Sequence, residues 1–150
     1  YSNWVLPSRL LCGPYPGHDG VNFSTFQEAK ENMDRILSDG IDTFICLQEE
    51  EEVVSNRPRY APLAGSDKTF VHLPIPDGSV PSHRKFIEHL TGIINFILHG
   101  RKVYLHCAGG HGRTGTYVAA ILQIFYRLGA NESLYITQYL HNTRRLVDKR

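Results

Sequence analysis

The feature that most constrains the fold is a short apolar strand that runs directly into a glycine-dense turn and then into a helix. The strand is predicted over Lys102–His106, the turn over Ala108–Gly112 and the helix over about 113–128. A strand followed this closely by a helix is typical of α/β folds, in which ligands bind at the carboxyl ends of parallel strands. The sequence therefore predicts a ligand-binding turn at the end of this strand.

Two further segments have the composition of buried strands. Ile41–Leu47 and Thr69–Ile75 are apolar and β-branched without clean alternation, as expected of strands covered on both faces. A shorter apolar segment, Arg9–Cys12, precedes them. Because strands alternate with helices along the chain, we predict an α/β fold with a central, mostly parallel twisted sheet of four to five strands flanked by helices.

Two helices are predicted between these strands from apolar residues that recur at helical spacing. The first begins at a capping box formed by Ser24 and Gln27 and is stopped by Gly40. The second is capped by Ser82 and is stopped by Gly100. Both should pack on the sheet through one apolar face.

A last helix is predicted, capped by Asn131. It should place four side chains toward the body of the protein: Leu134, Ile136, Tyr139 and Leu140. The chain contains no internal repeat and no linker long enough to separate domains. At 150 residues it can bury its own core, so we expect residues 1–150 to form a single domain.

The overall charge excludes several classes of partner. The chain has 16 Lys and Arg residues against 15 Asp and Glu residues, a formal charge of +1, so no overall field attracts it to nucleic acid or to an acidic membrane surface. The longest apolar stretches are far shorter than the ~20 residues that cross a bilayer. We therefore expect no nucleic-acid partner and no integral membrane association.

The three cysteines are Cys12, Cys46 and Cys107. Their odd number and wide spacing argue against a secreted disulfide framework and against paired zinc ligands, so we expect no metal and a reducing, cytoplasmic location. By default Cys12 and Cys46 are inert packing residues. The chain opens on Tyr1 rather than methionine, so the sequence leaves open whether it is excised from a larger protein.

The turn after the last predicted strand has the composition of an anion-binding nest. Gly109, Gly110 and Gly112 permit the unusual backbone angles and the close approach that converging N–H groups require. The helix that follows adds free N–H groups and the positive end of its dipole. We therefore predict a phosphate-binding loop of six residues: Ala108, Gly109, Gly110, His111, Gly112 and Arg113.

Four side chains around this loop have predicted chemical roles. Arg113 offers a planar fork that matches two phosphate oxygens. Cys107 lies at the start of the loop, where the same donors should stabilise its thiolate and make it a nucleophile at neutral pH. Thr114 should hydrogen-bond the sulfur and ease its departure, and His106 should orient the loop from beneath.

The run His106-Cys107, five residues, then Arg113-Thr114-Gly115 resembles the signature loop of the protein tyrosine phosphatase superfamily. The resemblance extends from about Arg9 to Tyr139 in the order of elements. It implies hydrolysis of phosphate monoesters through a cysteinyl-phosphate intermediate, with inorganic phosphate as product and no cofactor. Because the chain has no room for the tyrosine-containing loop of the larger members, it is most similar to the compact dual-specificity group.

The same resemblance implies a general acid on a loop about thirty residues before the cysteine. Asp77, in the segment Ile75–Pro81, fits that place. It would protonate the leaving oxygen and then activate the hydrolytic water. Asp67, on an earlier loop, is a competing candidate, and Asp77 could also be a turn residue because Asp-Gly is a common turn pair.

The substrate stays open at this point. The resemblance implies a phosphorylated protein, with phosphotyrosine first and phosphoserine or phosphothreonine as further candidates. His111 is the only ionisable side chain between Cys107 and Arg113, at a position where lipid-phosphatase relatives often have lysine, so a phosphoinositide phosphatase is the alternative.

Three other features carry weaker hypotheses. We interpret the acidic run Glu49–Glu52 as a solvated face, although it could brace the arginine from a neighbouring strand end. By resemblance to some relatives, Cys46 or Cys12 could form a regulatory disulfide with Cys107. Gln138 lies inside the last helix and does not match the water-positioning glutamine of the larger enzymes.

Two rival functions use the same loop differently. A rhodanese-like sulfurtransferase also holds an anion in a six-residue cysteine loop, but it has no need of Asp77. A phosphate-recognising module would bind phosphorylated partners without turning them over. The joint presence of Cys107, Arg113 and Asp77 favours the phosphatase over both.

Overall fold

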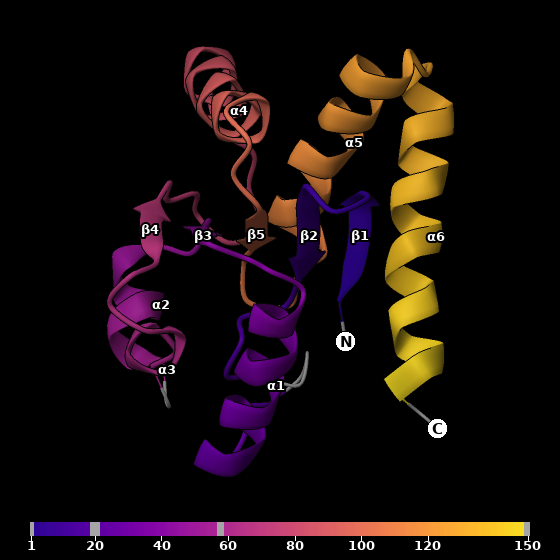
Figure 1. Cartoon of the computed structure of the whole chain (residues 1–150). Coiled ribbons are helices and arrows are strands. Elements are labelled where there is room, and N and C mark those ends of the chain that lie inside the picture. The colour runs from indigo at the N-terminus through magenta and orange to yellow at the C-terminus, as the bar shows by residue number, and fades with distance from the viewer. Residues whose placement is uncertain (1, 19–21, 57–58, 149–150) are drawn as a thin grey trace.

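A five-stranded sheet lies at the centre of the protein, with helices on both of its faces (Figure 1). The computed structural model describes residues 2–18, 22–56 and 59–148. The strands are β1 (Asn3–Leu6), β2 (Leu10–Gly13), β3 (Thr43–Cys46), β4 (Thr69–His72) and β5 (Val103–His106). Their order is β1-β2-β5-β3-β4, and only the β1-β2 pair is antiparallel. The predicted α/β fold with a mostly parallel sheet is confirmed.

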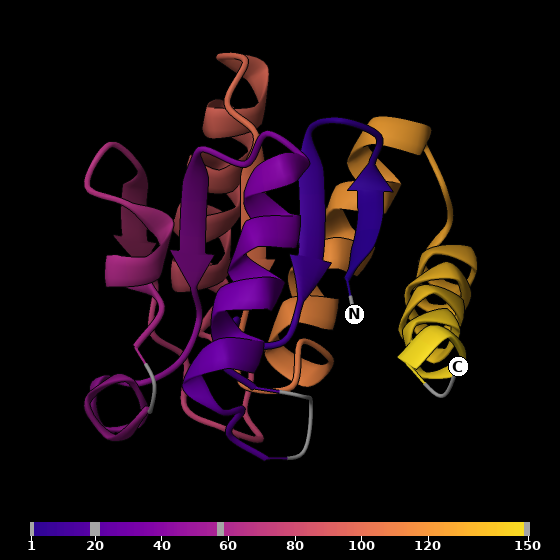
Figure 2. The same cartoon turned by 60° about the horizontal axis from the view of Figure 1, so that its bottom comes forward.

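The helices form two groups on opposite sides of the sheet. They are α1 (Phe26–Ser38), α2 (Glu50–Ser55), α3 (Ala61–Ala64), α4 (His83–Leu98), α5 (Gly112–Tyr126) and α6 (Ala130–Asp148). The first three cover one face and α4 and α5 cover the other, while α6 packs beside α5 near the edge strand β1 (Figures 1 and 2). None of the helices in the described ranges is long and apolar enough to span a bilayer.

The register of the four parallel strands aligns their carboxyl ends in one row. Gly13 of β2 pairs with His106 of β5, His106 pairs with Cys46 of β3, and Cys46 pairs with His72 of β4. The segments that follow these four residues therefore leave the sheet at the same edge. This is the edge at which parallel sheets place their ligands.

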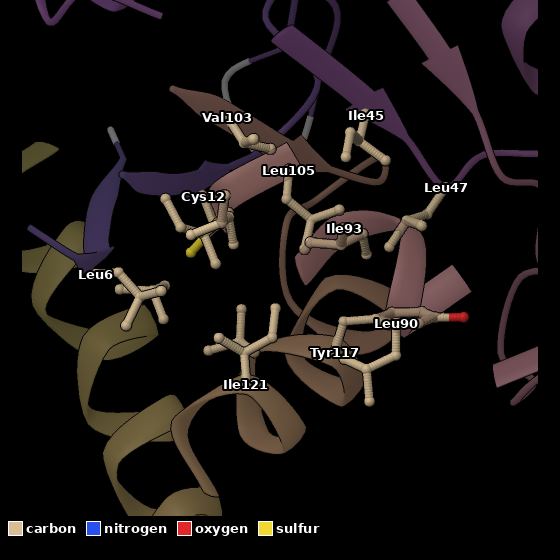
Figure 3. Packing of buried hydrophobic residues seen from close by; sticks show 14 of the residues in the cluster. Leu6, Cys12, Ile45, Leu47, Leu90, Ile93, Val103, Leu105, Tyr117 and Ile121 are labelled. Carbon is tan, nitrogen blue, oxygen red and sulfur yellow. The ribbon is translucent and has the colours of Figure 1, made fainter. Parts of the chain in front are cut away.

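Alternating side chains of the strands build a core on each face of the sheet. Val103 and Leu105 point toward α4 and α5, whereas Tyr104 points toward α1, as the period of two in a strand requires. Figure 3 shows the first of these cores, whose labelled residues are Leu6, Cys12, Ile45, Leu47, Leu90, Ile93, Val103, Leu105, Tyr117 and Ile121. Strands covered on both faces account for the absence of clean alternation in the sequence.

The start of α1 differs from the prediction by one residue. The cap is Thr25, whose hydroxyl accepts a hydrogen bond from the Glu28 N–H at 3.3 Å, while the Glu28 carboxylate accepts from the Thr25 N–H at 2.8 Å. Ser24 and Gln27 have the same spacing, but a carboxylate is a stronger acceptor for the cap N–H than an amide. The predicted cap at Ser82 is confirmed, since its hydroxyl accepts from the Lys85 N–H.

The prediction for α6 was wrong in two respects. The helix begins at Ala130 rather than after Asn131, and Leu134 and Tyr139 are 57% and 60% exposed instead of facing the body. Ile136 and Leu140, four residues apart on one face, do pack against the core. The side chains that share this face with them are polar, so apolar character alone could not identify it.

Candidate active site

The loop between β5 and α5 is held in place by the segment that follows β2. The Ala108 carbonyl accepts a hydrogen bond from the Tyr15 N–H at 2.9 Å. Gly110 has φ +68°, and a Cβ added there would lie 2.2 Å from the backbone of Gly13. Both its backbone angle and its close approach to Gly13 therefore require glycine at position 110.

The other two glycines of the loop are not required in the same way. Positive φ angles are absent at Gly109 and Gly112, and the space around a Cβ at Gly112 is open to 4 Å. The prediction that all three glycines serve unusual backbone angles and close approach was therefore wrong for the angles at Gly109 and Gly112. Of Gly110 and Gly112, only Gly110 is in close contact with the segment that follows β2.

The amino terminus of α5 opens into this loop. The helix begins at Gly112, and its N-cap residue, His111, makes no side-chain capping bond. The first N–H groups of the helix thus lack a side-chain cap and add the positive end of the helix dipole. Backbone donors of this kind bind phosphate without the help of a metal.

Cys107 lies at the base of the loop and is 3% exposed. Cys12 and Cys46 are also buried, and all three thiols are free. Thr114 occupies its expected place in the first turn of α5, but its hydroxyl forms no hydrogen bond to any part of the chain that the structure describes. The predicted bond from Thr114 to the sulfur is therefore not formed here, because the two groups are not in hydrogen-bond geometry.

His106 lies beneath the loop, fully buried among aromatic rings. Its Nδ1 is 3.0 Å from the Cys107 carbonyl oxygen and its Nε2 is 2.8 Å from the Tyr60 hydroxyl. Burial lowers the pKa of His106 to about 4, so the ring is neutral at pH 7. Since a carbonyl only accepts, we assign the proton to Nδ1, and Nε2 then accepts from Tyr60.

Arg113 joins three separate elements at the mouth of the loop. Its two Nη atoms donate to the Glu52 carboxylate of α2 at 2.6 and 2.8 Å. Nη1 also donates to the Ile75 carbonyl at 3.0 Å, and Nη2 lies 3.3 Å from Oδ1 of Asp77. The guanidinium is 4% exposed and is fixed along the edge that faces Glu52.

Glu52 corrects the interpretation of the acidic run Glu49–Glu52 as a solvated face. Partial burial opposes ionisation of Glu52, but hydrogen bonds from Arg113 and from the Glu49 N–H outweigh it and hold the pKa of this carboxyl below its ordinary value. The bond with Glu52 in turn raises the pKa of Arg113. A usable sequence signal existed: a loop arginine that must be buried needs a counter-charge, and this run follows the neighbouring strand.

Asp77, and not Asp67, is brought to the loop. Asp77 follows β4 at the carboxyl edge of the sheet, and its side chain lies 3.3 Å from Arg113 and is 80% exposed. Asp67 precedes β4 at the opposite edge, where it pairs with Lys68 at 2.8 Å. Only Asp77 is therefore near the predicted phosphate position.

The His111 side chain turns toward α6. Its Nε2 is 3.0 Å from Oε1 of Gln138, and its ring stacks on His141 with centroids 3.8 Å apart. Sequence reasoning missed both α6 partners, because the spacing of residues inside a helix does not reveal which distant loop it contacts.

Both the sheet topology and the loop geometry are those of compact, cysteine-dependent phosphatases of the dual-specificity type. Residues 20–125 match a family model, Tc-R-P, described as "Polymorphic toxin system, DSP-PTPase phosphatase". Since the match covers well over half of the chain, this protein belongs to that family. The family predicted from the cysteine loop is thereby confirmed.

Similar proteins agree with this assignment. The putative tyrosine phosphatase 067L of Invertebrate iridescent virus 3 is 32% identical over 147 residues, which are 95% of this chain and 54% of the viral protein. The chain thus spans about half the length of this relative. The crystal structure of Tk-PTP in the active form superposes with a TM-score of 0.70 at 25% identity, covering 93% of this chain and 83% of that one. PTPMT1 in complex with PI(5)P shares the fold, with a TM-score of 0.67, 16% identity and 99% of both chains covered.

Gly110→Ala should lower the melting temperature of the protein more than Gly112→Ala does. The first change forces a side chain into positive φ, which alone costs ~1–2 kcal/mol, and adds the clash with Gly13. The second meets open space. Thermal unfolding of both variants tests this, and equal melting temperatures would contradict the requirement for glycine at position 110.

Glu52→Gln should destabilise the protein by ~1–3 kcal/mol at pH 7, because it leaves the buried Arg113 with only the exposed Asp77 carboxylate as counter-charge. The pKa of Glu52 is lowered in the folded state, so its contribution is complete above the unfolded value of about 4.3 and is lost as the pH falls through the folded value. Melting temperatures of the wild type and the variant should converge toward pH 3. Glu51→Gln, an exposed change on the same helix, is the control, and a difference that persists unchanged at pH 3 would refute the pairing.

Proposed function

We propose that this protein is a phosphate monoester hydrolase that acts on phosphorylated proteins, with phosphotyrosine as the first candidate substrate, through a cysteinyl-phosphate intermediate. The observation that carries the proposal is the convergence of Cys107, Arg113 and Asp77 on one loop from three elements of the chain. Membership of the dual-specificity phosphatase family and the similarity to tyrosine phosphatases support it.

In the first step the Cys107 thiolate attacks phosphorus, and the ester P–O bond breaks. The leaving oxygen takes a proton from Asp77, whose exposed side chain lies where substrate enters. Glu52 occupies the two Nη atoms along one edge of Arg113, while the Nε–H makes no bond to the described residues. We propose that this Nε edge, whose Nη2 also lies 3.3 Å from Oδ1 of Asp77, holds two phosphate oxygens as negative charge develops.

In the second step the Asp77 carboxylate takes a proton from water, which attacks phosphorus. The P–S bond breaks and releases inorganic phosphate and the thiolate. Backbone N–H groups of the loop and the α5 terminus stabilise the oxyanion in both steps, which is the charge that a metal would otherwise neutralise. We propose the reaction without metal or organic cofactor.

The phosphoinositide alternative receives less support. PTPMT1 resembles this chain in fold and binds PI(5)P, but the side chain at issue here, His111, is engaged by Gln138 and His141. A side chain that faces α6 is poorly placed to meet a second phosphate on an inositol ring. Three free cysteines further support a reducing compartment, for which we propose the cytoplasm.

Steady hydrolysis of a small aryl phosphate should be measurable and should fall by at least about 10³-fold in Cys107→Ser, because the nucleophile is lost. Tungstate binding should persist in that variant, since the loop donors remain. Binding without turnover at any pH would instead support a phosphate-recognising module. Transfer of sulfur from thiosulfate to cyanide would support a sulfurtransferase.

Asp77→Asn should reduce the rate by ~10²–10⁴-fold for poor leaving groups and much less for good ones, because only the former need a proton. It should also remove the alkaline limb of the pH-rate profile. The matched control is Asp67→Asn, an exposed carboxylate at the other edge of the sheet. If Asp67→Asn produced these effects, the general acid would be misassigned.

A further inference from the structure

A second arginine lies behind the phosphate-binding loop. Arg144 comes from α6, 34 residues after Gly110, and is 6% exposed. Its Nη2 donates to the Gly110 carbonyl at 2.7 Å and to Nδ1 of His141 at 3.0 Å. Because an arginine only donates, Nδ1 of His141 must accept, so this nitrogen is unprotonated and the ring carries its proton on Nε2.

The contact with Gly110 bears on how the loop binds anions. A phosphate cradle works only if its N–H groups point inward, so its carbonyl groups must point outward and find partners there. Gly110 is the residue with positive φ, and its outward carbonyl would be a buried acceptor without Arg144. Arg144 therefore stabilises the backbone orientation that the cradle needs.

Among the described residues no ion pair forms with Arg144, and its buried Nε makes no hydrogen bond. The cavity beside it, lined by Cys12, Gly110, His141 and neighbouring residues, measures only about 10 Å³, so it holds at most about one water. Arg113, in contrast, is paired with Glu52 and Asp77. A buried charge without a partner is costly.

The titratable groups that face Arg144 do not neutralise it. Burial raises the pKa of Cys12 to about 11, against the opposing effect of Arg144, so this β2 thiol is neutral at pH 7. His141 of α6 and His111 of the loop, stacked on each other, are bases and carry no negative charge. Arg144 and Cys107 both act electrostatically on Cys12, so the two groups lie in one neighbourhood behind the loop.

We propose that Arg144 is a positioning residue of the anion site, which holds the Gly110 carbonyl outward and supplies a buried positive charge that favours the Cys107 thiolate and a bound oxyanion. Its effect on turnover rests on the proposed function, but its effect on the loop does not.

Arg144 belongs to α6, which lies beyond residues 20–125, the part of the chain that the family model matches.

The test compares Arg144→Met, Arg144→Lys and Ile136→Ala. The last is the matched control, because it weakens the packing of α6 on the core without touching Arg144. Two measurements that need no turnover are made on each variant: tungstate affinity by calorimetry, and the pH dependence of Cys107 alkylation by iodoacetamide, read by mass spectrometry. Melting temperatures report the cost to folding.

Arg144→Met should weaken tungstate binding about 10- to 100-fold, the range for loss of a hydrogen bond to a charged group. It should also move the alkylation midpoint to higher pH. Arg144→Lys, which keeps the charge but not the fork, should fall between Arg144→Met and the wild type. Ile136→Ala should lower the melting temperature yet leave affinity and midpoint unchanged within about twofold.

The proposal is overturned if Arg144→Met binds tungstate and titrates as the wild type does, or if Ile136→Ala changes both readouts as much as the arginine variants. If Arg144→Met does not fold, Arg144→Lys decides: readouts equal to those of Ile136→Ala overturn the proposal. If the wild type binds tungstate but hydrolyses no aryl phosphate, the phosphatase proposal is overturned and the Arg144 proposal is not.

Discussion

The bidentate pair between Arg113 and Glu52 connects the parts of this protein that the site depends on. One guanidinium, almost completely buried, is bound by a carboxylate from α2, a carbonyl that follows β4 and the start of its own helix α5. Because two carboxylate oxygens fix one edge of the guanidinium, the other edge has a single orientation relative to the loop. The position that we propose for phosphate is thus fixed by contacts within the chain.

The sheet brings the parts of the site together, because the segments that supply them follow neighbouring strand ends. Gly13, His106, Cys46 and His72 end their strands side by side, so each following segment supplies one part of the site. The segment after β2 supports the loop at Gly110, the segment after β3 leads to Glu52, and the segment after β4 carries Asp77. Contacts between distant residues follow from register, which is set by the buried faces of the strands.

Much of the fold and the chemistry could be predicted from the sequence because both depend on residues that are close together along the chain. Apolar segments and their glycine stops located the strands and most helices, and the spacing of Cys107, Arg113 and Thr114 within one turn identified the loop. The α6 partners of that loop could not be predicted, since Gln138 and Arg144 lie 27 and 34 residues from the residues they contact. Glu52, 61 residues from Arg113, had one signal, its place after the neighbouring strand. Helical periodicity also misplaced Leu134 and Tyr139, because the inner face of α6 is largely polar.

The contact between Asp77 and Arg113 has a different character from the pair beneath it. Its carboxylate is mostly in water, and an exposed ion pair contributes only about 0–1 kcal/mol. The segment that carries Asp77 is consequently held to Arg113 by a weak ion pair, while the bond between Arg113 and Glu52 stays in place. Ligands can exchange at the mouth of the loop at the expense of this outer contact alone, so opening the site does not require the buried framework to come apart.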